Sequence, residues 1–594
     1  MQSAETVLGV LRERGRRGLP CNELYRQLFN PQLYLLAYGR IYANQGAMTP
    51  GADTETVDGM SLGKIGRIID ALRHERYRFR PVRRVWIPKK NGKRRPLGIP
   101  TWSDKLVGEV VRLLLEAYYE PTFSERAHGF RPGRGCHTAL REVANTWTGT
   151  TWFIEGDLAD CFGSLDHTIM TDAVAQSIHD ERFLRLLRNM LTAGYLEDWI
   201  WNATLSGVPQ GGVASPVLSN IYLHRLDTFV ETVLVPHYTR GGRRARNHVY
   251  RRMQEAIAGA RRRGDRAAVR ALRKQVRDLP SVDPQDPDYR RLRYVRYADD
   301  ILIGFTGPRA EAETVKERLA VFLRDDLKLE LSQSKTLITH ARTGAARFLG
   351  YEITVQHNNS VISGGRRTAN GSIRLRVPTT VIKAKSARYL LRGKPAHRTS
   401  LMNADVHAII NTYGAEYRGI VGYYLLASDV WRLNRLHWVM ETSLLKTLAG
   451  KHHSSVSKMA RKFTATIDTP AGPRKCLQAR TERGEGRKPL VAQFGGIPLT
   501  RQKNTVLIDR EPVPATRRKE LIARLLTGRC EICGYTGTVL VHHIRKLADL
   551  EKPGQPEQPD WMKLMTKRRR KTLVVCQACH TTIHIGQPST TLTQ

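Results

Sequence analysis

"RYVRYADDIL", residues 293–302, places two adjacent acids, Asp299 and Asp300, inside an apolar and aromatic run. Carboxylates held away from water cost free energy, and two side by side repel each other. The order of apolar run, acids and apolar run predicts a strand, a tight turn and a second strand, with both acids at the tip of a hairpin. A divalent cation would relieve the repulsion, so the stretch predicts a metal site at the edge of a sheet.

A third acid has a similar setting. The segment "TWFIEGDLADCF" (151–162) runs apolar into Asp157, as a buried strand that ends in an acid would. Two Mg²⁺ ions about 3.5–4 Å apart need a further carboxylate, usually from elsewhere in the chain, and Asp157 is the candidate. An isolated Asp-Asp pair is more often a capped surface turn, but the apolar flanks and the partner strand argue against that alternative here.

The overall charge narrows the class of partner. The chain has 594 residues, too many for one hydrophobic core, with 96 Lys+Arg against 55 Asp+Glu, a net charge of +41 and a pI near 10.3. Such an excess repels itself unless a polyanion neutralises it, and nucleic acid supplies that charge. The sequence has neither a signal peptide's apolar core nor an apolar run near ~18 residues, so no membrane partner is expected.

Patterning divides the chain unevenly. Residues 1–80 are expected to be largely helical, and residues 379–463 to form amphipathic helices without strands. Residues 240–293 carry 17 Lys/Arg against 6 Asp/Glu, with apolar residues at helical spacing, which predicts a basic helical hairpin. Residues 464–520 are rich in Gly, Pro, Arg and Lys and are expected to form a loosely structured connector.

Two further segments suit a nucleotide. "WIPKKNGKRRPLGIP" (86–100) is a strand, a basic turn and a second strand, and a hairpin that ends in Lys and Arg can fold over triphosphate oxygens. "LSGVPQGGVASPVLSNIYLHRLD" (205–227) is a Gly-rich turn that opens a helix, with Gln210 just before two glycines. Such a turn lets the backbone approach a nucleotide or template closely.

The tail contains two Cys-x-x-Cys pairs, which predict a tetrahedral zinc site rather than disulfides. Their cysteines are Cys530, Cys533, Cys576 and Cys579. The remaining cysteines are scattered and expected to be buried thiols, namely Cys21, Cys136, Cys161 and Cys476. His580 and His584 are four residues apart, so they would share one face of a helix. A purely structural zinc finger would leave the tail's histidines without a role. These histidines are His542, His543, His580 and His584.

In this order, the segments resemble the reverse transcriptases encoded by group II introns, over nearly the whole chain. The matching blocks are "NQGAMTPGADTETVDGMS" (44–61), "RRPLGIP" (94–100), "AHGFRPGRGCHTAL" (127–140), the Gln-bearing block (206–227), "YADD" (297–300), "LKLELSQSKTLITH" (327–340) and "FLGYEI" (348–353). The segments "NTYGAEYRGIVGYY" (411–424) and "SLLKTLAGKHHSSVSKMARKF" (443–463) look like the family's thumb, the maturase region.

The resemblance implies a multidomain α+β protein. It would consist of a right-hand polymerase with fingers and palm around an antiparallel sheet, a helical thumb, and a small zinc-bound ββα-metal HNH domain. The implied boundaries are 1–80 for the N-terminal extension, 81–355 for fingers and palm with the basic insertion at 240–293, 375–465 for the thumb or maturase domain, 466–520 for a basic DNA-binding connector, and 521–594 for the HNH endonuclease.

The resemblance also assigns polymerase roles residue by residue. Asp157, Asp299 and Asp300 would hold two Mg²⁺ ions, one that activates the primer 3′-hydroxyl and one that neutralises the leaving pyrophosphate. Lys89 and Arg95 would contact the triphosphate, although Lys90 also fits because the sequence does not fix the hairpin register. Gln210 would contact the sugar and base region, Phe162 would exclude a ribose 2′-hydroxyl, and Lys335 would lie near the primer terminus. Relatives often have an acid where this chain has Gly163, a position that is not a metal ligand.

The tail resembles the HNH nucleases fused to many such proteins. By that match His543 is the general base that activates water, and His542, His580 and His584 bind a single divalent ion at the scissile phosphate. The roles of His542 and His543 are open to exchange. Thr572 replaces the central Asn of the motif, and its hydroxyl is able to hydrogen-bond the base.

The implied function combines several activities. The protein would bind its own group II intron RNA and assist splicing as a maturase, nick a double-stranded DNA target, and extend the new 3′ end with dNTPs by copying the intron RNA, which is the mobility reaction called retrohoming. A bacterial cytoplasmic, nucleoid-associated location is expected, and the oligomeric state is not specified. A maturase with inactive enzymatic domains is the main alternative, against which the intact acid and Cys/His sets argue. A nuclease with a basic arm would not explain the ordered blocks along 44–353.

Overall fold

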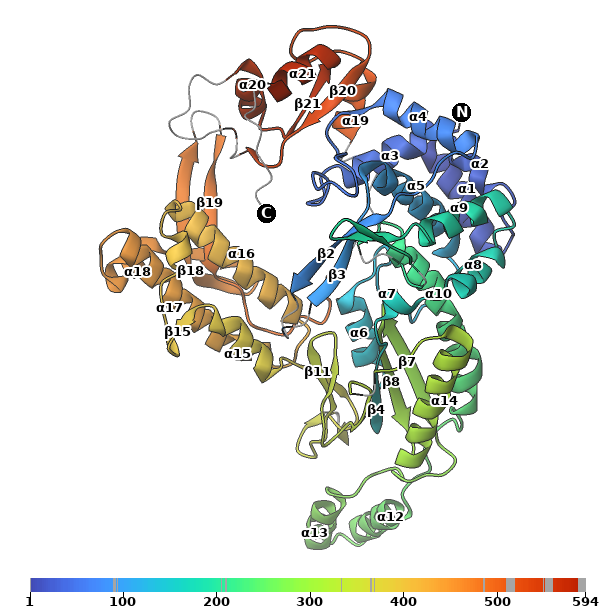
Figure 1. Cartoon of the computed structure of the whole chain (residues 1–594). Helices are drawn as coiled ribbons and strands as arrows, with labels where there is room; N and C mark the ends of the chain where they lie inside the picture. Colours follow the sequence, from blue (N-terminus) through green and yellow to red (C-terminus); the bar gives the residue numbers. More distant parts are fainter. Residues whose placement is uncertain are drawn as a thin grey trace.

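The computed structural model describes residues 2–88, 92, 94–204, 206–208, 211–332, 334–363, 366–367, 369–483, 487–508, 519–547, 550 and 559–585. Figure 1 shows the N-terminal helices beside the C-terminal domain, the central sheet below them, and the helices of residues 379–463 on the left. Lys89 and Gln210, two of the predicted nucleotide contacts, lie outside the described residues.

The N-terminal extension is helical, as predicted. Its helices are α1 (Ala4–Arg16), α2 (Leu24–Gln27), α3 (Pro31–Ile41) and α4 (Leu62–Arg73). Side chains of Ser3, Asn30 and Ser61 accept hydrogen bonds from the first turns of α1, α3 and α4, which stabilises each start. The helices α1 and α3 pack on the buried helix α5 (Trp102–Tyr119), so the extension shares its core with the segment that follows it.

The two strands of the hairpin predicted at 86–100 are present. Strand β2 (Val82–Pro88) pairs antiparallel with β3 (Arg94–Ile99), and β2 also pairs in parallel with β5 (Tyr195–Glu197), which in turn pairs with β6 (Ile200–Asn202). Arg95 lies opposite Ile87 on the exposed part of this sheet.

A four-stranded antiparallel sheet in the order β7-β8-β4-β9 forms the centre of the molecule. Its strands are β7 (Arg291–Tyr297), β8 (Asp300–Thr306), β4 (Trp152–Asp157) and β9 (Leu337–His340). Alternate residues face two cores: Ile154 and Ile303 pack with α10 (Ser215–Phe229) and α14 (Arg309–Leu327), whereas Phe153 and Leu302 pack with α6 (Cys136–Thr146). Both predicted strands that carry the acids are confirmed.

The basic insertion forms the predicted helical hairpin, at the lower end of Figure 1. Its helices are α12 (His248–Arg262) and α13 (Arg266–Val276). The insertion leaves and rejoins the body at one point, where Arg240 and Arg290 exchange backbone hydrogen bonds of 3.1 and 3.0 Å.

Residues 346–463 form a small sheet followed by a helical lobe. The sheet consists of β10 (Ala346–Phe348), β11 (Tyr351–Val355) and β14 (Ile373–Arg376), and the helices are α15 (Thr379–Ala387), α16 (Val406–Tyr424), α17 (Asn434–Lys451) and α18 (Val456–Phe463). A short hairpin of β15 (Leu390–Leu391) and β16 (Lys394–Pro395) interrupts the helices, which the sequence did not predict.

The prediction of a loosely structured connector is wrong for residues 464–495. There the chain forms an antiparallel sheet of β17 (Thr464–Thr469), β18 (Gly472–Arg483) and β19 (Arg487–Gly495). Leu477 and Phe494 are buried against α16. Alternating apolar residues therefore outweigh the Gly, Pro and Arg content that favoured a loop.

The C-terminal domain has the predicted ββα order of β20 (Val539–His543), β21 (Thr572–Cys576) and α21 (Gln577–Ile585). Its sheet gains a third strand, β1 (Met60–Ser61), from the N-terminal extension. The helix α19 (Lys519–Leu526) also packs on α3. The chain is thus a multidomain α+β protein whose first and last segments are in direct contact. Among the described helices, none is both long and apolar enough to cross a bilayer.

Candidate active sites

The three predicted acids lie on adjoining strands. Asp157, the last residue of β4, is directly opposite Asp300, the first residue of β8. Asp299 occupies the turn between β7 and β8, after Ala298, whose φ of 54° closes the hairpin. The acids therefore meet at one end of the sheet, and they come from segments about 140 residues apart in the sequence.

Burial and mutual repulsion dominate the electrostatics of this end of the sheet. Burial raises the pKa of Asp299, and the charge of Asp157 adds to the rise, whereas Arg95 opposes it. Burial and then the charges of Asp299 and Asp157 raise the pKa of Asp300 to about 6. Lys335 donates a hydrogen bond of 2.7 Å from Nζ to Oδ2 of Asp157. These carboxylates are partly buried and only partly neutralised by Lys335 and Arg95. Carboxylate oxygens in such a setting suit hard divalent cations such as Mg²⁺.

A glycine that the sequence reasoning missed supports the acidic turn from behind. A Cβ on Gly129 would lie 2.3 Å from the backbone nitrogen of Ala298. Asn220 donates a hydrogen bond of 3.0 Å to the Gly129 carbonyl, and the backbone N–H of His128 donates one of 2.9 Å to the carbonyl of Arg296. The loop before α6 is therefore in van der Waals contact with the residue that precedes Asp299.

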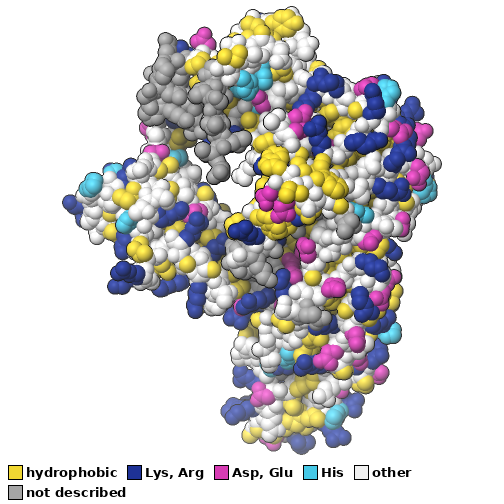
Figure 2. Space-filling model, in the orientation of Figure 1, with side chains coloured by type: hydrophobic (Ala, Val, Ile, Leu, Met, Phe, Trp, Pro, Cys, Tyr) yellow, Lys and Arg dark blue, Asp and Glu magenta, His cyan; other side chains and the backbone are white. Residues whose placement is uncertain are grey.

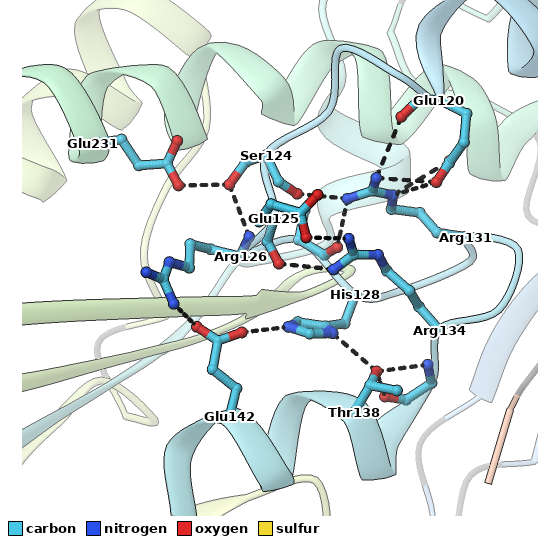
Figure 3. A network of polar contacts seen from close by, with 12 residues as sticks. Glu120, Ser124, Glu125, Arg126, His128, Arg131, Arg134, Thr138, Glu142 and Glu231 are labelled. Carbon is cyan, nitrogen blue, oxygen red and sulfur yellow. Dashed lines mark hydrogen bonds and ion pairs between the residues drawn. The ribbon is translucent and has the colours of Figure 1, made fainter. Parts of the chain in front are cut away.

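A network of polar contacts holds this loop in place (Figure 3). Arg131 donates from Nε to the carboxylate of Glu120 at 3.0 Å and from Nη1 to the carbonyl of Ala127 at 2.8 Å. The ring of His128 lies 2.9 Å from both Thr138 Oγ1 and Glu142 Oε2, which belong to α6. Because these groups are mostly buried and mutually paired, they hold the loop against the acidic turn.

The predicted sugar-selecting residue follows Asp157 closely in the chain. Phe162 belongs to the short helix α7 (Cys161–Ser164), and its ring makes an edge contact with Phe130 at 6.2 Å between centroids. The carbonyl of Phe162 accepts a hydrogen bond of 2.8 Å from the N–H of Val208, which lies in the Gly-rich turn. A cleft between this turn and the hairpin of β2 and β3 is lined by Arg84, Arg94, Asp160, Gly163 and Ser206, among others.

The four tail cysteines converge as predicted, with their sulfur atoms within 4.8 Å of one another. The Sγ atoms of Cys533 and Cys576 are 3.7 Å apart, which matches the edge of about 3.8 Å in a tetrahedron with the usual Zn–S bond length. The donor set and its spacing therefore fit a structural zinc ion. Cys21, Cys161 and Cys476 are buried and Cys136 is partly buried, with no disulfide in the described chain.

The other tail cluster contains His542, His580 and His584, as predicted, and an unpredicted acid, Asp58, from the N-terminal extension. Burial would raise the pKa of Asp58, but the neighbouring rings of His542 and His580 lower it well below its usual value. A signal for Asp58 was present in the block 44–61, but nothing in the sequence placed that block beside the tail.

His543 is next to this cluster but points elsewhere. Its Nε2 lies 2.8 Å from the hydroxyl of Tyr38, a residue of α3. Burial lowers the pKa of His543 to about 3, so the imidazole is neutral, the protonation state of a general base. Thr572 lies opposite His543 on β21, and its hydroxyl accepts a hydrogen bond of 2.9 Å from Arg524. Thr572, the residue expected to bond His543, is thus hydrogen-bonded to Arg524, and the imidazole of His543 is hydrogen-bonded to Tyr38 instead.

Comparisons with known proteins identify the families that the chain resembles. Family models match a reverse transcriptase (RNA-dependent DNA polymerase) over residues 87–257, a type II intron maturase over 371–494, and an AI2M/AI1M-like HNH endonuclease over 530–580. The group II intron-encoded protein LtrA of Lactococcus lactis subsp. cremoris is 37% identical over 94% of both chains. An uncharacterized 91 kDa protein in a cob intron of Schizosaccharomyces pombe is 32% identical over 95% of this chain and 70% of its own. Protein YkfC of Escherichia coli is 34% identical over 56% of this chain and 84% of its own.

Proposed function

This chain belongs to the group II intron-encoded proteins, and we propose that the two sites described above carry its polymerase and nuclease chemistry. The protein is a multifunctional reverse transcriptase, maturase and HNH endonuclease. The proposal adds the residues, the ions, the partners and the right-hand arrangement, with β2 and β3 as fingers, the central sheet as palm and α15 to α18 as thumb. The observation that carries the polymerase proposal is the meeting of Asp157 and Asp300 on adjacent strands.

In the polymerase site, the acids would hold two Mg²⁺ ions, which when bound activate the primer 3′-hydroxyl and neutralise pyrophosphate. Arg95, whose charge acts on Asp299, would contact the triphosphate of the incoming dNTP, and so would Lys89. Phe162 would leave no room for a ribose 2′-hydroxyl, and Gln210 would contact the sugar and base. Lys335 would position the primer terminus.

In the nuclease site, His543 would take the proton from the attacking water, since its ring is neutral. His542, His580 and His584 would hold one divalent ion at the scissile phosphate, and the cysteines would hold zinc. The nick in a double-stranded DNA target would supply the 3′ end that the polymerase extends.

The intron RNA is the proposed partner of the basic surface. Lys and Arg side chains are spread over the face shown in Figure 2 rather than confined to one patch. A dispersed basic surface suits a large folded RNA, because each neutralised phosphate releases counterions. The insertion and the segment 466–520 are proposed to contribute RNA and DNA contacts respectively, in a bacterial cytoplasm close to the nucleoid.

Paired variants test the proposal. The full-length protein is purified with its intron RNA, and Asp299→Ala should reduce extension of a DNA primer on an RNA template by several orders of magnitude because a metal ligand is removed. Asp326→Ala, which removes an exposed acid of α14, is the matched control and should extend normally. RNA binding should be equal in all three proteins.

The nuclease is tested in the same preparation. His543→Ala should still splice and copy a supplied primer, but should fail to nick duplex DNA. Near-normal extension by Asp299→Ala would refute the acid assignment, and nicking by His543→Ala with zinc retained would move the base to His542. Absence of extension and nicking in the parent, with splicing intact, would favour the maturase whose enzymatic domains are inactive.

A further inference from the structure

The N-terminal extension reaches into the nuclease site through the edge of its sheet. Strand β1 pairs with β20, with Met60 opposite Val541, and the N–H of Gly59 donates a hydrogen bond of 3.0 Å to the Val541 carbonyl. This pairing places Asp58 directly beside the end of β20, where the N–H of His543 donates a hydrogen bond of 2.7 Å to its Oδ1.

Asp58 lies at coordination spacing from all three histidines. Its Oδ2 is 2.8 Å from Nε2 of His584 and 3.2 Å from Nε2 of His580, and its Oδ1 is 3.3 Å from Nδ1 of His542. The Nε2 atoms of His580 and His584 are 3.3 Å apart. A tetrahedral ion with Zn–N or Zn–O bonds of the usual length has edges of about 3.3 Å, so these four groups outline one ion.

A second observation points to a ligand in the same place. His542 is only 2% exposed. Among the residues that the structure describes, its Nδ1 lies 3.3 Å from Asp58 Oδ1 without forming a hydrogen bond, and its Nε2 has no hydrogen-bond partner. A buried imidazole without partners is costly, and an ion bound between His542 and Asp58 would satisfy it. The cluster is therefore built for a cation.

Four protein ligands make a closed site. Catalytic metal sites keep three protein ligands and leave the fourth position to water or substrate. With Asp58 in that position, the scissile phosphate has no place on the ion. The base is also covered, because His543 is only 6% exposed and is bonded to Tyr38.

We propose that Asp58 is the fourth ligand of the HNH divalent ion in the DNA-free protein, and that it occupies the position that the scissile phosphate takes during cleavage. The N-terminal extension of the polymerase would thus hold the nuclease closed until target DNA displaces it. This inference rests on the histidine site proposed above, which the experiment tests separately.

Cobalt binding to the full-length, zinc-loaded protein tests the ligand. The visible absorption of Co²⁺ reports its coordination, and the part that disappears in His580→Ala belongs to the histidine site. Asp58→Ala should weaken this binding by about tenfold or more, since an anionic ligand is removed. Asp58→Asn, which keeps the side chain's size and its bond from His543, should weaken it too. Asp70→Ala, which removes an exposed carboxylate of α4, should bind Co²⁺ like the parent.

Single-turnover nicking of duplex DNA at saturating metal tests the displacement. Asp58→Ala should nick at least as fast as the parent, whereas His580→Ala should not nick. Parent-like cobalt affinity in both Asp58 variants would overturn the inference, and so would loss of nicking in Asp58→Ala with zinc content and thermal midpoint unchanged. A parent without any His580-dependent cobalt signal would refute the histidine site itself, and with it the inference.

Discussion

Arg296 and Asp227 form an ion pair that is completely buried, with both side chains 0% exposed. The guanidinium donates from Nε to Oδ1 at 2.7 Å and from Nη2 to Oδ2 at 2.6 Å, and the hydroxyl of Tyr294 donates to the same carboxylate at 2.8 Å. Arg296 also donates a hydrogen bond of 3.0 Å to the carbonyl of Ala298. The pair thereby ties α10 to the turn that carries Asp299.

Removing one member of this pair should strongly decrease the free energy of unfolding. Asp227→Asn leaves a buried guanidinium without its counter-charge, which costs about 3–5 kcal/mol. Urea unfolding followed by tryptophan fluorescence measures the decrease in the free energy of unfolding. Arg309→Met, which breaks the exposed pair with Glu313 on α14, should cost about 0–1 kcal/mol. Equal decreases in the two variants would contradict the structural role given to the buried pair.

Gly129→Ala should impair polymerisation without touching substrate. The new Cβ would lie 2.3 Å from the backbone of Ala298, so the acidic turn must shift. We expect primer extension to fall well below that of the parent, with intron RNA binding preserved. Gly66→Ala is the control, since this exposed position of α4 has open space and alanine favours helix. Unchanged extension in Gly129→Ala would show that the loop does not position the turn.

Phe162→Val should relax sugar selection. A smaller side chain opens space beside the 2′ carbon, so incorporation of ribonucleotides should rise while extension with dNTPs is largely retained. The ratio of ribonucleotide to deoxynucleotide incorporation on one primer–template measures the change. If the ratio stays at the parent's value, Phe162 serves only to pack against Phe130.

Replacing six arginines of the insertion with serine should weaken intron RNA binding. All six are exposed, and they are Arg251, Arg252, Arg261, Arg262, Arg263 and Arg266. Each phosphate that is no longer neutralised lowers the salt slope of binding by about 0.7–0.9, so filter binding over a range of salt concentrations should give a flatter line. Splicing should suffer, whereas extension on a generic primer–template should not. Parallel salt dependences would mean that the hairpin does not bind the RNA.

Cys530→Ser should unfold the C-terminal domain, because zinc binding supplies much of the folding free energy of a small metal domain. Limited proteolysis should cut residues 519–585 rapidly, and zinc content should fall. Cys476→Ser, at a buried cysteine of β18 outside the cluster, should keep its zinc. Extension should persist in Cys530→Ser, and a protease-resistant tail without zinc would exclude a structural role for the ion.

Features that depend on a short stretch of sequence are predictable from it. Strand–turn–strand patterning located Asp299 and Asp300, and the apolar run before Asp157 located their partner. Contacts between distant segments have no such local signal. The contact of Asp58 with His584 joins the N-terminal extension to the tail, and Arg296 is buried because it pairs with Asp227, which lies far from it in the sequence. The β17–β19 sheet was missed because its apolar alternation is diluted by Arg, Gly and Pro.

Because Arg240 and Arg290 exchange backbone hydrogen bonds, the helical hairpin of α12 and α13 is inserted at a single point of the chain. Because the chain departs and returns at one place, the central sheet is topologically complete without residues 241–289, and their number is free to vary without altering the sheet's registers. A different hairpin, grafted between these two arginines, should therefore change the RNA contacts proposed for the insertion while leaving the central sheet and its acids as they are.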